Sequence, residues 1–203
     1  MSVENDFEAL RQAVIKADEE SMCDCRPMES PLVQMLEFVR NHPEERDYFV
    51  DRFVRIAIGE LDAPPELIPF CMRELRYPEV LQAVRSLYES LQAENKHAGY
   101  MNYCSHVTKA YSDFVWEEGS MWDYYRAKEL VPSIVPELIP RISSESAEDV
   151  FNALFALEEI GPAARSAIPA IEAFLRTPRG RTNLGGRARL ALLSIAGLNE
   201  PQG

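Results

Sequence analysis

A short apolar phrase containing proline recurs three times along the chain. It reads Leu67-Ile68-Pro69, then Leu138-Ile139-Pro140, then Ala167-Ile168-Pro169. Each copy lies in an apolar stretch with helical spacing, which is followed by a break and a second apolar stretch. Proline fits best in the first turn of a helix, where its missing N–H costs no hydrogen bond, so we expect each copy to open a helix. A unit of two helices that recurs along a chain predicts stacked helical hairpins.

The remaining segments also have helical patterns. Near the N-terminus, Phe7, Leu10 and Val14 share one face at helical spacing. Ser30 and Pro31 are residue types preferred at an N-cap and at the first helical position, so a second helix is predicted to begin there. No stretch alternates apolar and polar residues for long enough to predict a strand. We therefore expect an all-α protein.

The C-terminal part carries the most specific pattern. A run of apolar and small residues over 156–171 joins a helix that ends in Ile160-Gly161-Pro162 to a helix that contains Ala167-Ile168-Pro169-Ala170-Ile171. Gly161 is suited to end a helix in a left-handed conformation, and Pro162 prevents its continuation. This run resembles the HEAT-like repeat of phycobilisome lyase-type proteins, and the resemblance is clearest over residues 150–197.

The resemblance implies a particular architecture. It predicts a right-handed α-solenoid of stacked helical hairpins over residues 63–203. Residues 1–62 match the repeat weakly, and we expect them to form divergent N-terminal helices that pack on the solenoid. The two parts are expected to make one continuous domain.

Charge limits the kinds of partner that the chain binds. Its 203 residues include 33 acidic and 21 basic side chains, which give a net charge of −12, and residues 1–62 carry most of the excess. A field of this sign repels phosphate backbones and disfavours nucleic acid. It also speeds encounter with a basic protein, which we take as the expected partner. Acidic surfaces serve solubility as well, and that interpretation stays open.

Two further features bear on location and metals. No apolar run approaches the roughly 20 residues of a membrane span, and the N-terminus lacks the basic start and apolar core of a secretory signal. We expect a cytoplasmic protein without a membrane partner. Cys23 and Cys25 form a C-x-C pair, but the sequence lacks the second pair or the histidines at zinc-site spacing, so no metal site is predicted.

The first candidate site is a cluster of aromatic and acidic residues between the repeats. Both tryptophans of the chain lie in it. Aromatic side chains anchor protein interfaces because they bury a large area at low entropic cost, but they also fill cores. Both interpretations stay open, with Trp122, Tyr124 and Tyr125 expected to be the more exposed. The candidate partner-binding residues are Trp116, Glu117, Glu118, Trp122, Asp123, Tyr124 and Tyr125.

The second candidate site is a basic loop over residues 176–189 in a chain that is otherwise acidic. Gly185 and Gly186 precede a predicted helix there, but the Lys-Ser/Thr pair of a phosphate-binding loop is missing. Either the arginines contact an anion, or they neutralise acidic helix surfaces nearby. The candidate anion-contacting residues are Arg179, Arg181, Arg187 and Arg189.

Evidence for catalysis is poor. Cys104 and His106 are two residues apart, so on a helix they would not share a face as a nucleophile and its base. We predict no catalytic residues and no cofactor. The expected function is a non-enzymatic protein-binding scaffold or adaptor, with an immunity-type inhibitor of a basic bacterial toxin as one form of it. Because some HEAT-like proteins are lyases or DNA-repair enzymes, the resemblance leaves an enzyme of that kind as the alternative.

Overall fold

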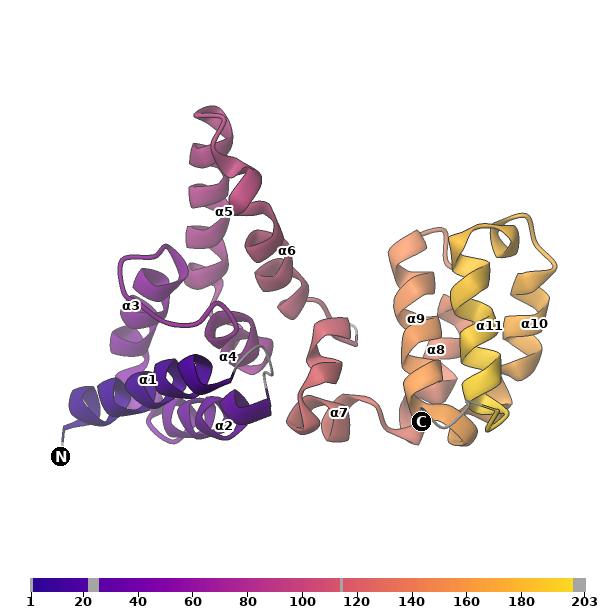
Figure 1. The fold of residues 1–203 in the computed structure, drawn as a ribbon, viewed down its shortest axis with the longest axis horizontal. Helices are drawn as coiled ribbons and strands as arrows, with labels where there is room; N and C mark the ends of the chain where they lie inside the picture. Colours follow the sequence, from indigo (N-terminus) through magenta and orange to yellow (C-terminus); the bar gives the residue numbers. More distant parts are fainter. Residues whose placement is uncertain (1, 22–25, 114, 199–203) are drawn as a thin grey trace. The chain divides into compact units, whose positions relative to one another are not determined.

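The computed structural model describes residues 2–21, 26–113 and 115–198. Over these ranges every regular element is an α-helix or a 3-10 helix, so the chain is all-α, as its sequence predicts (Figure 1). None of the helices in these ranges is long and apolar enough to cross a membrane. The cysteine pair Cys23 and Cys25 lies outside the described residues.

Contacts divide the chain into two compact units, residues 1–112 and residues 113–203. The boundary expected after Asp62 therefore lies inside the first unit. The reason is that helices on both sides of Asp62 pack against one another, as the following element pairs show: α2 with α4, α3 with α4, and α3 with α5. The N-terminal helices thus share a compact body with residues 63–112.

In the described residues of the first unit the structure has six α-helices and two 3-10 turns. They are α1 (Val3–Glu20), α2 (Arg26–Arg40), η1 (Pro43–Glu45), α3 (Arg46–Ala57), α4 (Leu67–Leu75), α5 (Pro78–Ala93), η2 (His97–Gly99) and α6 (Met101–Ala110). The core between α1 and α3 is aromatic, because the ring of Phe7 lies 5.8 Å from both Phe49 and Phe53. All three side chains are fully buried, so this contact fixes α1 on α3.

Helix α2 begins earlier than its sequence predicts. It starts at Arg26, and Pro31 lies inside it rather than at its first position. Met28, Leu32 and Met35 are all buried on one face of α2. Burial of Met28 on the same stripe favours an extra turn before Ser30, which outweighs the hydrogen bond that Pro31 cannot donate.

Two arginines close the end of the first unit. The guanidinium of Arg73 donates to the carbonyls of Ala110 (3.3 Å) and Ser112 (2.7 Å). Arg76 donates to the carbonyls of Tyr111 (2.6 Å) and Ser112 (2.7 Å). The last carbonyls of a helix have no partner within it, so these contacts supply the donors that the end of α6 needs.

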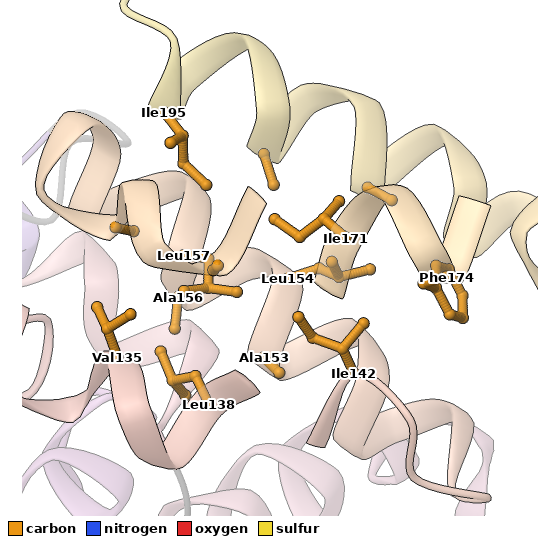
Figure 2. Packing of buried hydrophobic residues seen from close by; sticks show 14 of the residues in the cluster. Val135, Leu138, Ile142, Ala153, Leu154, Ala156, Leu157, Ile171, Phe174 and Ile195 are labelled. Carbon is orange, nitrogen blue, oxygen red and sulfur yellow. The ribbon is translucent and has the colours of Figure 1, made fainter. Parts of the chain in front are cut away.

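The second unit contains two antiparallel helical hairpins. Its elements are η3 (Glu117–Met121), α7 (Asp123–Glu129), η4 (Pro132–Ile134), α8 (Val135–Arg141), α9 (Ala147–Ile160), η5 (Gly161–Ala167), α10 (Ile168–Leu175), η6 (Arg179–Arg181) and α11 (Asn183–Ile195). Helix α8 packs on α9, α10 packs on α11, and α9 and α11 join the two hairpins (Figure 1). Figure 2 shows the core between them, where Leu154, Leu157 and Ile171 meet from both hairpins.

The three copies of the proline phrase do not occupy equivalent positions. Pro69 is the third residue of α4 and Pro169 the second residue of α10, so both lie in a first turn as predicted. The prediction is wrong for Pro140, which lies next to the last residue of α8. Two prolines upstream, Pro132 and Pro136, already start the helical segment there. Pro140 instead falls on the exposed side of α8.

Gly161 ends α9 as the sequence predicts. Its φ of +64° lies in the region that side chains avoid, although its ψ of −136° is not that of a left-handed helix. The hydroxyl of Ser194 on α11 donates to the carbonyl of Glu158 (2.6 Å) in the last turn of α9. The end of the first hairpin is therefore held by the second.

Candidate functional site

The aromatic cluster is core in the second unit. Trp122 and Tyr125 are each 1% exposed and Trp116 is 4% exposed. The rings of Trp116 and Tyr125 meet edge to face with centroids 5.3 Å apart. The expectation that Trp122 and Tyr125 are among the more exposed aromatic residues is wrong, since both lie against protein atoms. Tyr124 is half-buried, with the ammonium of Lys128 5.5 Å from the centre of its ring.

The acidic residues of this cluster have several environments. Glu117 and Glu118 are half-buried and Asp123 is exposed. A neighbouring carboxylate, Glu129, accepts a hydrogen bond from the backbone N–H of Trp116 (3.1 Å). Segment η3 also packs on α9. The candidate partner-binding residues thus form a cover over one side of the first hairpin rather than an open anchor site.

The basic segment is shorter as a loop than its sequence predicts, because α11 already begins at Asn183. Its four candidate arginines do not converge. Arg179 donates to the carbonyl of Ser144, Arg187 packs on α9, and Arg181 is exposed. Arg189 lies on another part of α11, described below. The contact of Arg187 with Glu158 matches the alternative in which the arginines neutralise acidic helix surfaces, whereas Arg179 contacts a neutral carbonyl.

Gly180 and Gly185 allow stretches of backbone to approach one another closely. A Cβ on Gly185 would lie 1.9 Å from the carbonyl oxygen of Gly180, and a Cβ on Gly180 would lie 2.4 Å from the carbonyl oxygen of Phe174. Both distances are far below contact. Gly186, in contrast, faces open space. Gly185 is therefore explained by the seating of α11 against η6 and not by an anion.

Arg187 occupies an aromatic cage on the surface of α9. Its guanidinium carbon lies 4.9 Å from the ring centre of Phe151 and 4.8 Å from that of Phe155. A guanidinium nitrogen lies 3.4 Å from a carboxylate oxygen of Glu158. Burial raises the pKa of Glu158, and the positive charge of Arg187 partly offsets this effect. These contacts hold α11 against α9, and they occupy the guanidinium of Arg187.

A further opening in this unit, not predicted from the sequence, is a groove between α10 and α11. Its volume is about 540 Å³. Large apolar side chains form most of its surface, and Leu193 and Leu198 are exposed there. We call this opening the α10–α11 groove. It is lined by Ile168, Glu172, Arg189, Leu192, Leu193, Ala196 and Leu198.

Two charged side chains line the α10–α11 groove. Glu172 has an ion-pair partner in Arg176, one turn further along α10, at 3.7 Å. Arg189 is exposed and makes neither a hydrogen bond nor an ion pair within the part of the chain that the structure describes. The lining thus carries one charge of each sign, and because Glu172 is paired with Arg176 outside the lining, Arg189 is the charge in the groove without a partner among the described residues.

A signal for the groove exists in the sequence of α11. Leu190, Leu192, Leu193 and Ile195 point in several directions around the helix. A helix that is apolar on all sides is normally covered on all sides. The structure covers Ile195 and leaves Leu190 and Leu193 exposed, at 48% and 44%. The presence of apolar residues on several faces of α11 is therefore the sequence signal for the groove.

The described cysteines and the histidine near one of them have separate environments. Cys71 is fully buried, and burial raises the pKa of its thiol. Cys104 is half-buried and His106 exposed. Across the described ranges, no group of three or more His, Cys, Asp or Glu side chains is arranged to hold a metal ion.

Comparisons with protein-family models, with curated proteins and with solved structures gave no match. What the fold defines is an all-α chain of two compact units, the second of which contains two helical hairpins.

Proposed function

We propose that this chain is a non-enzymatic protein-binding scaffold of HEAT-like type and that it binds its partner in the α10–α11 groove. The observation that carries the proposal is the apolar floor of that groove with two exposed leucines, Leu193 and Leu198. A partner that covers these side chains gains part of the about 1.5–3 kcal/mol that favours full burial of a leucine, because Leu193 and Leu198 are 44% and 65% exposed.

The position of the groove in the second unit supports the proposal. Helix α9 of the first hairpin contacts η3 as well as α11, so the aromatic segment covers it. The second hairpin has no such cover over its groove within the described residues. In helical repeat proteins each hairpin buries its apolar face against a neighbour. An apolar face without a cover among the described residues therefore favours a partner in that place.

The charge of the chain bears on the partner as a whole. A net charge of −12 accelerates encounter with a basic protein, and residues 1–112 carry 20 acidic against 12 basic side chains. Within the proposal the partner is a basic protein. An adaptor and an immunity-type inhibitor of a basic toxin remain the two forms that the function takes.

Two leucines on α11 offer a matched test. Leu193 lines the groove, whereas Leu190 is similarly exposed on the same helix but is not part of the lining. We expect Leu193→Glu to abolish capture of the partner from an extract of the source cell. Leu190→Glu, which adds the same charge, is expected to retain it. Mass spectrometry of the captured proteins, in a side-by-side comparison with the unchanged protein, makes the measurement.

Two results would contradict the proposal. One is a set of captured proteins that is the same for both variants and the unchanged chain, because the groove would then not be the site. The other is a set that does not differ from a bead-only control. Activity of the captured partner, assayed with and without this chain, then separates an inhibitor from an adaptor.

A further inference from the structure

We infer that the segment which enters the α10–α11 groove is an amphipathic α-helix of the partner and that it places a carboxylate against Arg189. This inference rests on the proposed function and adds the chemistry of the docked segment.

The walls of the groove have the spacing of helix packing. On α10, Ile168 and Glu172 are one turn apart. On α11 and its C-cap, Arg189, Leu193 and Ala196 follow one another at intervals of four and three residues. The two helices are antiparallel and joined by residues 176–182 (Figure 1). A channel between such rows accepts the apolar ridge of a third helix, and Ala196 leaves room for a larger side chain.

The polar and apolar residues of the groove separate along its length. Glu172 and Arg189 both lie near the middle of their helices, and they are the residues of the lining that are nearest in sequence to the connection between α10 and α11. Ile168 and Leu198 lie toward the other ends. The groove thus offers an apolar channel with charge at one end, which suits a helix with an apolar stripe and a charged residue beside it.

The sign of that charge selects a carboxylate. Glu172 already has Arg176 at 3.7 Å, whereas Arg189 has no partner among the described residues. A carboxylate from the docked helix would accept hydrogen bonds from the guanidinium of Arg189 and balance the local charge. The fork of a guanidinium matches a carboxylate, which makes this contact a determinant of orientation as well as affinity.

A local preference for a carboxylate is compatible with a basic partner. Long-range steering depends on the net charge of both proteins, and most of the acidic excess of this chain lies in residues 1–112. The docked contact depends on one side chain at a few ångströms. A basic protein that carries one acidic residue on an amphipathic helix satisfies both.

Two matched libraries of displayed helical peptides test the inference. Both contain roughly 15-residue helices with Leu, Ile, Val, Met or Phe randomised along one stripe. One has Glu and the other Lys at the positions that flank the stripe. Each is selected on the full-length protein and on three variants, Arg189→Glu, Arg181→Glu and Leu193→Glu. Arg181 is the matched control because it is exposed, outside the groove and free of partners among the described residues.

The expected result is a reversal confined to one variant. The unchanged protein and Arg181→Glu enrich the Glu library, whereas Arg189→Glu enriches the Lys library. Selected Glu peptides lose about fivefold or more in affinity for Arg189→Glu, as expected when an exposed ion pair becomes a repulsive pair. Leu193→Glu binds neither library. Because Arg181→Glu and Arg189→Glu change the net charge equally, a general attraction for lysine cannot produce this pattern.

Other results overturn the inference, and they differ from a failure of the proposed function. Equal enrichment of both libraries on the unchanged protein and on Arg189→Glu would contradict the proposed contact between a carboxylate and Arg189. If neither library is enriched but capture of the cellular partner still depends on Leu193, the amphipathic helix is contradicted and the proposed function is not. Sedimentation that shows a dimer lost in Leu193→Glu makes a second copy of this chain the occupant. Loss of partner capture alone, with the libraries behaving as expected, counts against the function.

Discussion

The carbonyl oxygen of Gly180 occupies the space that a side chain on Gly185 would need, with only 1.9 Å to the position of its Cβ. We expect Gly185→Ala to lower the free energy of unfolding by about 3 kcal/mol, because backbone rather than a movable side chain is in the way. The matched control is Gly186→Ala, which meets nothing within 4 Å. It should stabilise α11 by about 0.5–1 kcal/mol. Equal effects of the two changes in urea unfolding would refute this account.

Burial of the aromatic segment predicts that its main role is structural. Trp122→Ala should lower the free energy of unfolding by about 3–5 kcal/mol, since it empties a fully buried site. Met121→Ala, at the exposed neighbouring position, should change it by less than about 0.5 kcal/mol. Thermal unfolding followed by circular dichroism measures both. If Trp122→Ala kept full stability and only weakened partner binding, the surface interpretation of the cluster would return.

The carboxyl of Glu158 predicts a pH dependence of stability. Burial raises its pKa in the folded protein, so the folded state binds the proton more tightly than the unfolded state. The contribution of this group is therefore present at acidic pH and is lost as the pH rises through its folded pKa. The difference in the free energy of unfolding between Glu158→Gln and the unchanged protein should therefore move in favour of Glu158→Gln as the pH rises from about 4 to about 7.

The measurement for Glu158 is urea unfolding of both proteins at several pH values. Glu145→Gln, at an exposed position of the α8–α9 connection, is measured beside it as the control for the loss of one acidic side chain. A stability difference between Glu158→Gln and the unchanged protein that did not vary with pH would contradict the prediction. So would a difference that moved in favour of the unchanged protein toward neutral pH.

The contact between Ser194 and the end of α9 predicts a smaller effect. Ser194→Ala removes the hydroxyl that donates to the carbonyl of Glu158 and leaves that acceptor partly buried. A loss of about 1–2 kcal/mol is expected. Ser166→Ala, at an exposed position in η5, should be neutral. Hydrogen exchange should also rise in the last turn of α9 if the contact holds the two hairpins together.

Local signals in the sequence were sufficient for much of the fold. Pro78 and Pro169 mark helix starts, and Gly161 marks the end of α9, because each of these residues acts through its own backbone. The start of α2 was misplaced because burial of Met28 extends the helix past Ser30 and Pro31. Pro140 was misplaced because helix starts upstream compete for the same segment.

The environment of a side chain was harder to predict than its helix. Tryptophan and tyrosine are common both in cores and in interfaces, so residue type alone does not assign Trp122 and Tyr125 to either. Only the contact of their segment with α9 decides between the two. The four arginines of the basic segment were grouped by sequence, but the turn between η6 and α11 sends Arg179, Arg187 and Arg189 to different neighbours. The groove itself depends on the separation of α10 and α11, which no single segment encodes.

Arg73 and Arg76 hold the carbonyls of residues 110–112 at the point where the chain leaves the first unit. Both arginines lie more than thirty residues earlier in the sequence. The last residues of the first unit are therefore held by side chains that are distant in the sequence. A fragment cut after Ser112 keeps all of these acceptors. One cut before Ala110 loses the acceptors of four hydrogen bonds, so we expect it to be less stable than a fragment cut after Ser112.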